Sequence, residues 1–252
     1  MMEIQNFYRQ ATTEELEFYD SELYPLQDRV FEIASVYEDN IYLTGSTALS
    51  RFHYQHHLSE DLDFFTTTDD LNLIARDLVA RLRQSDFTIQ IDSINYCFAR
   101  FFIIQSTYRL KIELVKEFNW LGNLRQTDSG IYLNNLEDMG ANKISAFEKK
   151  AEIKDIIDLY FSAFEARAEI KDIIDLYFIT QTISLERLFE LADSKGMPVA
   201  YERLMTIRLT TINDRGISGQ VLMRKTLDDQ EMTSFLSSLK LRTEAEVKKK
   251  QI

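Results

Sequence analysis

The sequence has few of the residues that build loops and disulfides. Its 252 residues include 7 Gly, 2 Pro and 1 Cys, and 45% are hydrophobic. This composition excludes collagen-like, low-complexity and disordered chains, and it predicts mostly regular structure with a large helical share. The single Cys97 excludes an internal disulfide.

Long apolar runs and a leader-like N-terminus are absent as well. The longest apolar stretch, near Phe101 to Ile104, is far shorter than the roughly 20 residues of a membrane helix. The first residues, MMEIQNFYRQ, lack the basic-then-apolar pattern of a signal peptide. We therefore expect a soluble, cytoplasmic protein that does not contact membranes.

Acidic residues outnumber basic ones, with 41 Asp and Glu against 29 Lys and Arg, which gives a net charge of −12. Such a field repels nucleic acid unless a local basic surface or a bound metal offsets it. Residues 1–135 carry 11 basic and 21 acidic groups, and residues 136–252 carry 18 and 20. The asymmetry suggests that cations bind in the first part and anionic ligands contact the second.

Hydrophobic periodicity predicts an α+β domain over residues 1–135 and a helical domain, a C-terminal bundle, over residues 136–252. Two helical pieces are expected from Thr13 to about Tyr37, interrupted at Pro25, and another helix from about Asp69 to Gln84. About five strands in a small mixed sheet are expected at IYLTG (41–45), DLDFF (61–65), FTIQIDSI (87–94), CFARFFII (97–104) and YRLKIELV (108–115).

The helical part contains a tandem duplication. SAFEKKAEIKDIIDLYF (145–161) is followed directly by SAFEARAEIKDIIDLYF (162–178), and the two copies are identical at 15 of 17 positions. Repeat arrays normally need at least three copies and longer periods, so a solenoid is not indicated. A recent or engineered in-frame duplication is the simpler account.

The densest group of chemically useful residues is LTGSTALSRFHYQHHLSEDLDFF (43–65). Residues two apart on a strand point to the same face, so Asp61 and Asp63 place two carboxylates side by side, about 7 Å apart at their backbones. Gly45 permits close approach of a ligand to the backbone, and Ser46 at a helix start offers a hydroxyl and N–H groups to an anion. Each feature alone is common, but the combination is not.

A third carboxylate, Glu113, lies in KIELV between two apolar residues. If that strand lies beside residues 61–65, three carboxylates converge. Mg²⁺ and similar hard cations prefer carboxylates together with substrate phosphates, as in phosphoryl transfer. The pattern therefore predicts a metal site of Asp61, Asp63 and Glu113. The three His residues in HYQHH, in contrast, lack the further ligands of a zinc site.

These motifs resemble the nucleotidyltransferase superfamily, with its polymerase-β-like minimal fold, whose signature is an apolar residue before Gly-Gly/Ser, then Asp-apolar-Asp, then a later Asp or Glu. The region 47–65 is similar to the AbiEii/AbiGii toxin branch at Thr47, Ala48, Leu49, His56, Ser59 and Phe64. Ser46 departs from the branch's second Gly, and His57 stands where Arg is usual; protonated His57 would partly replace that charge.

The family's later motifs are a helical Lys and then Arg/Lys-x-x-x-Lys-Asp-x-x-Asp. They match Lys143 and, in the first copy, Lys150, Lys154, Asp155 and Asp158; the second copy offers Arg167, Lys171, Asp172 and Asp175. The resemblance implies catalytic roles for Asp61, Asp63, Glu113, Lys143, Lys154 and Asp155. It implies nucleotide contacts by Gly45, Ser46, Thr47, His57, Ser59 and Lys150.

Helix geometry favours the first copy. Lys143 and Lys154 are 11 residues apart, about 20° from three full turns, whereas on a continuous helix Lys171 would be about 42 Å away from Lys143 and about 80° out of phase. The second copy would serve the same site only if the chain folds back. Either copy could then occupy the site, with the other extruded or exchanged with a second chain.

The resemblance implies an abortive-infection or type IV toxin that uses Mg²⁺ or Mn²⁺ and transfers a nucleotide from an NTP to RNA, such as a tRNA 3′ end, and that has a cognate antitoxin. RNA contacts are expected from the second half, at Lys195, Arg203, Arg208, Arg215, Arg224 and Lys225. Two alternatives stay open: transfer to a protein side chain, or a catalytically silent binding protein disabled or re-registered by the duplication.

Overall fold

The computed structural model describes residues 8–146, 170–195 and 220–250 of a mixed α+β protein. The chain divides into two compact units, Ala11–Asn135 and Met1–Gln10 with Leu136–Ile252. The sequence predicted that residues 8–10 belong to the first domain, whereas they group with the helical unit. The reason is strand β1 (Tyr8–Gln10), which pairs in parallel with β9 (Val221–Met223), a partner more than 200 residues away along the chain.

The first unit contains a seven-stranded mixed sheet in the order β4-β5-β6-β3-β2-β8-β7. Its pairs β3–β6 and β2–β8 are parallel, and the other neighbouring pairs are antiparallel. The mixed sheet is as predicted, with two short strands that the sequence did not signal. The strands are β2 (Tyr42–Thr44), β3 (Leu62–Thr66), β4 (Ile89–Ile94), β5 (Phe98–Ile104), β6 (Arg109–Lys116), β7 (Arg125–Gln126) and β8 (Tyr132–Leu133).

Helical segments of this unit begin with α1 (Thr13–Phe18), which is capped by Thr12 and Glu15 in a reciprocal capping box. A π-helical turn (Tyr19–Leu23) joins α1 to α2 (Tyr24–Ala34) without leaving helical backbone angles, and Pro25, where the sequence predicted an interruption, lies in the first turn of α2. Further segments are a 3-10 helix (Ser35–Asn40), α3 (Gly45–Ala48) with a following π-helical turn (Leu49–His53), and α4 (Leu71–Gln84).

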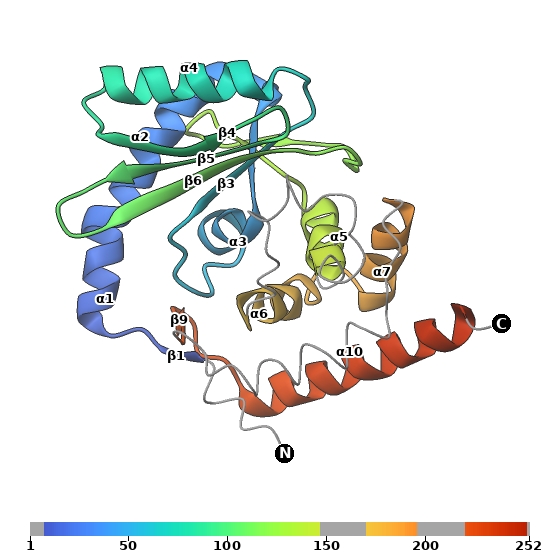
Figure 1. Cartoon of the computed structure of the whole chain (residues 1–252). Coiled ribbons are helices and arrows are strands. Elements are labelled where there is room, and N and C mark those ends of the chain that lie inside the picture. Colours follow the sequence, from blue (N-terminus) through green and yellow to red (C-terminus); the bar gives the residue numbers. More distant parts are fainter. Residues whose placement is uncertain (1–7, 147–169, 196–219, 251–252) are drawn as a thin grey trace. The chain divides into compact units, whose positions relative to one another are not determined.

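The two faces of the sheet differ in character. Helices α2 and α4 lie over one face and α3 over the other (Figure 1). Phe64 on the α2 side packs against Phe31, with ring centroids 6.4 Å apart. Because side chains alternate along a strand, the buried residues Phe64 and Ile112 leave Asp63 and Glu113 on the opposite face. That opposite face carries the polar site described below.

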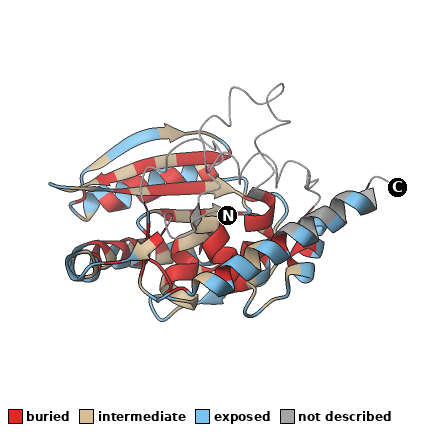
Figure 2. Ribbon diagram, turned by 90° about the horizontal axis from the view of Figure 1, so that it is seen from below, coloured by how far each residue is buried: buried red, intermediate tan, exposed pale blue. Residues whose placement is uncertain are grey.

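The second unit is mainly helical. Among the residues that the structure describes, its helices are α5 (Leu136–Ala146), α6 (Ile170–Ile179), α7 (Leu185–Ser194) and α10 (Asp229–Lys250). Gly140 lets α5 approach α7 closely, because an added Cβ would lie 2.5 Å from Leu188 Cδ2. Helix α10, which runs to the C-terminus in Figure 2, buries Met232 and Leu239 and exposes most of its described residues.

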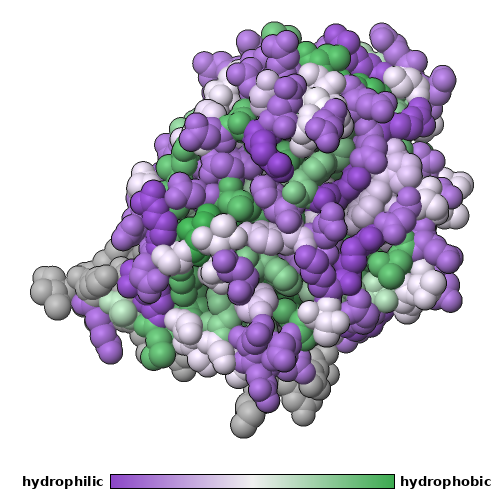
Figure 3. Space-filling model, turned by 180° about the vertical axis from the view of Figure 1, so that it is seen from behind, coloured by the Kyte–Doolittle hydropathy of each residue, from purple (hydrophilic) through white to green (hydrophobic). Residues whose placement is uncertain are grey.

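Large apolar side chains reach the surface singly, on different elements: Val36, Leu73, Ile91, Tyr96, Phe118 and Leu241. On the face shown in Figure 3, hydrophilic side chains surround small hydrophobic patches. Single exposed apolar residues are ordinary on protein surfaces. Within the described ranges, no helix is both long and apolar enough to cross a membrane.

Candidate active site

Three carboxylates gather on the face of the sheet opposite α2 and α4. Strand β3 runs parallel to β6, and its residue Asp63 pairs directly with Glu113. Neighbouring strands lie about 4.8 Å apart, so these two side chains are adjacent. Asp61 directly precedes β3, and it meets the same cation as Glu113, the ammonium of Lys111. The sequence could state the pairing of β3 with β6 only as a condition. That pairing is present, and it brings the three carboxylates to one face.

Two basic residues of this face were missed by sequence reasoning. Lys111 Nζ lies 2.9 Å from Asp61 Oδ2 and 3.6 Å from Glu113 Oε1. Arg100 Nε donates to Glu113 Oε1 at 2.6 Å. Alternation in KIELV does place Lys111 and Glu113 on one face, but Arg100 is identified only by the antiparallel register of β5 and β6.

The carboxylates around Lys111 keep its side chain positively charged. Burial disfavours the ammonium, but the negative charges of Asp61, Glu113 and Asp63 together outweigh burial and raise the pKa of Lys111 above its ordinary value. Lys111 is thus a permanent cation at physiological pH, and it stands between carboxylates that would otherwise repel one another.

The backbone of Gly45 lies directly against the Asp63 side chain. Gly45 follows β2 directly, with φ of +71°, and a Cβ built on it would lie 2.6 Å from Asp63 Oδ2. Thr44 pairs with Asp63 across the antiparallel β2–β3 ladder, which fixes this close approach. Ser46 follows in α3, so the predicted Gly-Ser turn does join a strand to a helix beside the carboxylates.

Gly45→Ala is expected to lower the rate of the nucleotidyl transfer that the sequence resemblance implies by about a hundredfold, because the added methyl displaces the Asp63 carboxylate. The matched control is Gly122→Ala. Gly122 has φ of +74°, but a Cβ added to it would meet no atom within 4 Å, so this variant carries the same backbone strain without the clash. Steady-state rates of both variants test this expectation, and equal losses would contradict it.

Thr47 and Ser59 form hydrogen bonds next to the backbone of Asp61. The Thr47 hydroxyl donates to the backbone carbonyl of Asp61, and its oxygen lies 2.7 Å from Ser59 Oγ. Both side chains are buried. Their observed role is to position Asp61, and direct contact of Thr47 or Ser59 with a nucleotide stays a prediction.

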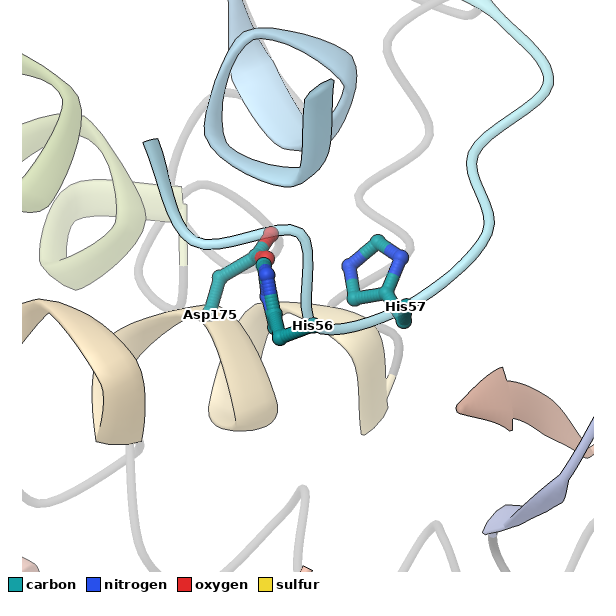
Figure 4. A group of neighbouring side chains, drawn as sticks. All are labelled: His56, His57 and Asp175. Carbon is teal, nitrogen blue, oxygen red and sulfur yellow. The ribbon is translucent and has the colours of Figure 1, made fainter. Parts of the chain in front are cut away.

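His56 and His57 lie on the extended segment that follows α3 and its π-helical turn (Figure 4). Their ring centroids are 4.3 Å apart, and His57 Nδ1 donates to the carbonyl of Leu58 at 2.9 Å. That bond fixes the orientation of the His57 ring. A phosphate contact by His57 stays a prediction.

His53 makes stability depend on pH. Burial, and then the charge of Arg125, lowers the pKa of His53 to about 4. In the unfolded chain the pKa of His53 returns to about 6.5. At pH values between the two pKa values, the unfolded chain therefore binds more protons than the folded chain. The free energy of unfolding should therefore fall by roughly 2 kcal/mol from pH 7 to pH 4, allowing for the partial exposure of the ring. Urea unfolding of wild type and His53→Leu at both pH values tests this, since the variant should lose that part of the fall.

In the helical unit, Lys143 of α5 lies between two aspartates of α6. Its Nζ is 2.5 Å from Asp172 Oδ1 and 2.7 Å from Asp175 Oδ2. Figure 4 shows Asp175 projecting from α6. Burial disfavours the ammonium, but the two negative charges outweigh it and hold the pKa of Lys143 above its ordinary value.

In this cluster the second copy reaches Lys143. Asp172 and Asp175 belong to that copy, and on one continuous helix its Lys171 would lie about 42 Å from Lys143. The 2.5 Å ion pair instead shows α5 and α6 side by side. That the first copy serves the active site stays a prediction. The first-copy residues Lys150, Lys154, Asp155 and Asp158, and Arg167 of the second copy, lie outside the described residues, so their roles stay predictions. Lys171, predicted with them, lies on α6 and is partly exposed.

Lys195 is not the RNA contact that the sequence suggested. Its Nζ lies 2.6 Å from Asp138 Oδ1 and 2.7 Å from Asn142 Oδ1, and the Lys195 and Asp138 side chains are both 0% exposed. The pair joins the end of α7 to α5 inside the helical unit. Of the other basic residues, Lys225 is exposed and Arg224 half-buried, whereas Arg203, Arg208 and Arg215 are outside the described ranges.

The sheet site offers the type of ligand that a divalent cation prefers. Asp61, Asp63 and Glu113 supply only carboxylate oxygens, which are the ligands that Mg²⁺ and Mn²⁺ prefer. The ammonium of Lys111 already shows that a cation is accommodated between Asp61 and Glu113. Beside them, Gly45 provides backbone that a phosphate can approach closely.

Carboxylates next to a glycine turn are groups that nucleotidyl transfer uses, and this fold with this arrangement is typical of a nucleotidyltransferase. More specifically, the chain belongs to the AbiEii family, because residues 29–246 match the family model described as nucleotidyl transferase AbiEii toxin, type IV TA system. Membership implies an NTP substrate, a divalent metal and an antitoxin partner in general terms.

Solved structures of similar fold include two from Helicobacter pylori. A candidate nucleotidyltransferase from H. pylori has 17% sequence identity and a TM-score of 0.55, over 91% of this chain and 97% of that chain. JHP933 from Helicobacter pylori has 18% identity and a TM-score of 0.54, over 92% of this chain and 96% of that chain. At these identities, the likeness shows the fold. No curated protein matches this sequence.

Proposed function

We propose that the protein transfers a nucleoside monophosphate from an NTP to an RNA hydroxyl, such as a tRNA 3′ end, with Mg²⁺ or Mn²⁺ as cofactor. The observation that carries this proposal is the convergence of Asp61, Asp63 and Glu113 beside Gly45. The acceptor is proposed from membership of the toxin family together with the basic residues of the second half.

In this proposal Asp61 and Asp63, with Glu113, hold the divalent cation, which neutralises charge on the phosphates when it is bound. Gly45 and Ser46 offer backbone and hydroxyl groups to the triphosphate. The acceptor oxygen attacks the α-phosphorus, a new oxygen–phosphorus bond forms, and the bond to the β-phosphate oxygen breaks to release pyrophosphate. The acceptor hydroxyl's proton leaves to solvent.

Glu113 is proposed to position the acceptor hydroxyl. Its Oε1 accepts from Arg100 and faces Lys111, so the carboxylate is held in one orientation. A group held in this way reduces the freedom that must be lost when the reacting atoms meet. Arg100 therefore acts through Glu113 as a positioning residue.

The test incubates purified protein with Mg²⁺, each α-labelled NTP in turn, total RNA and cell protein. We expect label on a band of tRNA size, and none with the Asp61→Ala/Asp63→Ala variant. Label on protein alone would contradict the proposed acceptor and favour transfer to a side chain. Absence of label with all four NTPs would favour a silent binding protein.

A further inference from the structure

Lys111 comes from the same strand as one of the carboxylates that it contacts. In β6, Lys111 and Glu113 are two residues apart and share a face, and Leu62 pairs with Ile112, so Lys111 lies next to Asp61 in the sheet. The Lys111 side chain is 25% exposed and reaches Asp61 and Glu113 with one ammonium. This contact is within one compact unit and depends on sheet register alone.

The carboxylates of this face are paired with cations. Lys111 contacts both Asp61 and Glu113, and Arg100 contacts Glu113 and, at 3.7 Å, Asp92. Affinity for a divalent cation rises with the number of uncompensated carboxylates. The pairing of Lys111 with Asp61 and Glu113 therefore weakens the binding of metal alone.

The two cations are not equivalent. Arg100 donates its Nε to Glu113 from the neighbouring strand β5, where the pairing of Arg100 with Glu113 sets its position. Lys111 reaches its partners as a compact charge at the end of a flexible four-carbon stem. The Lys111 ammonium can therefore move away from Asp61 and Glu113 by rotation of its side chain, without a change in the sheet.

We propose that Lys111 is the counter-ion of the metal-free site and that the divalent cation displaces its ammonium from Asp61 and Glu113. The inference rests on the proposed function, since it concerns the same carboxylates. Metal alone then binds weakly, and the additional negative charge of a nucleoside triphosphate favours its entry. The occupancy of the site by metal is thereby linked to the presence of nucleotide.

The test measures Mn²⁺ binding without nucleotide, by electron paramagnetic resonance of the free ion, for the wild type and three variants. Lys111→Met removes the ammonium, and Lys111→Arg keeps a positive charge. Lys116→Met is the matched control, because Lys116 lies on the same strand and pairs with Asp69 instead of the site carboxylates.

We expect Lys111→Met to bind Mn²⁺ at least about tenfold more tightly than wild type, with Lys111→Arg and Lys116→Met within about threefold of it. Equal or weaker binding by Lys111→Met would overturn the proposal. Circular dichroism checks the fold of each variant, and Lys111→Gln replaces Lys111→Met if the latter unfolds. If both unfold without metal, Mn²⁺ must restore their folding, and failure to do so would also overturn the proposal.

The proposed function is tested separately by Asp63→Asn in the same titration. Loss of Mn²⁺ binding in Asp63→Asn, with equal binding in wild type and Lys111→Met, would remove the inference and leave the function standing. Mn²⁺ binding that is unaffected by Asp63→Asn would instead remove the metal site on which both rest.

Discussion

Asp63→Asn should reduce the rate of nucleotidyl transfer by at least about a thousandfold. Asp63 lies at the centre of the site, since it pairs with Glu113 on one side and with Thr44 on the other, and its Oδ2 faces Gly45. The amide keeps the size of the carboxylate but removes one of the three charges that we propose hold a cation. The measurement is single-turnover incorporation of label from an α-labelled NTP.

The control for this experiment is Asp69→Asn. Asp69 carries a carboxylate that is 94% exposed and pairs with Lys116 away from the site. Its removal should change the rate by less than about twofold, because exposed ion pairs contribute little. A rate for Asp63→Asn above one tenth of wild type would contradict the assignment of the metal-holding carboxylates.

Asp138→Ala should lower the free energy of unfolding of the helical unit by about 3–5 kcal/mol. Asp138 and Lys195 are both fully buried, so the substitution leaves the Lys195 ammonium in the interior without its carboxylate, beside the neutral Asn142 Oδ1 at 2.7 Å. Urea unfolding followed by circular dichroism measures the loss.

Two further variants separate burial from charge pairing. The double variant Asp138→Leu/Lys195→Met replaces the ion pair with apolar side chains and should recover most of the stability. Glu137→Ala breaks the half-exposed pair of Glu137 with Arg187, 3.3 Å apart, and should cost less than about 1 kcal/mol. A loss below about 1 kcal/mol in Asp138→Ala would show that the buried pair is not what joins α5 to α7.

The sheet could be predicted from the sequence because its strands alternate and its motifs follow one another in order. The runs at 41–45 and 61–65 gave β2 and β3 within one residue at each end. That β3 and β6 are neighbours could be stated only as a condition, because parallel strands are separated by intervening chain and no local sequence pattern identifies the partner. The structure shows that they are neighbours and that Asp63 pairs with Glu113.

The basic partners of the carboxylates could not be predicted. A Lys on a strand beside acidic residues is usually solvated, and whether Lys111 turns toward Asp61 depends on the order of strands. The same holds for β1, whose parallel pairing with β9 joins residues at opposite ends of the chain. The interior position of Lys195 was equally hidden, because a Lys near a helix end is commonly exposed.

The duplicated segment shows a limit of periodicity. Phase along one continuous helix favoured the first copy for Lys143, but α6 packs beside α5, and Lys143 contacts Asp172 and Asp175 of the second copy. Two tandem copies that agree at 15 of 17 positions carry the same pattern, so the pattern alone does not select between them.

The most direct test of nucleotidyl transfer is the stoichiometry of pyrophosphate release. With the labelled NTP, Mg²⁺ and RNA, we predict one pyrophosphate for each nucleoside monophosphate incorporated, because attack at the α-phosphorus expels the β- and γ-phosphates together. Release of orthophosphate in place of pyrophosphate, or transfer of the γ-phosphate to the acceptor, would contradict the account.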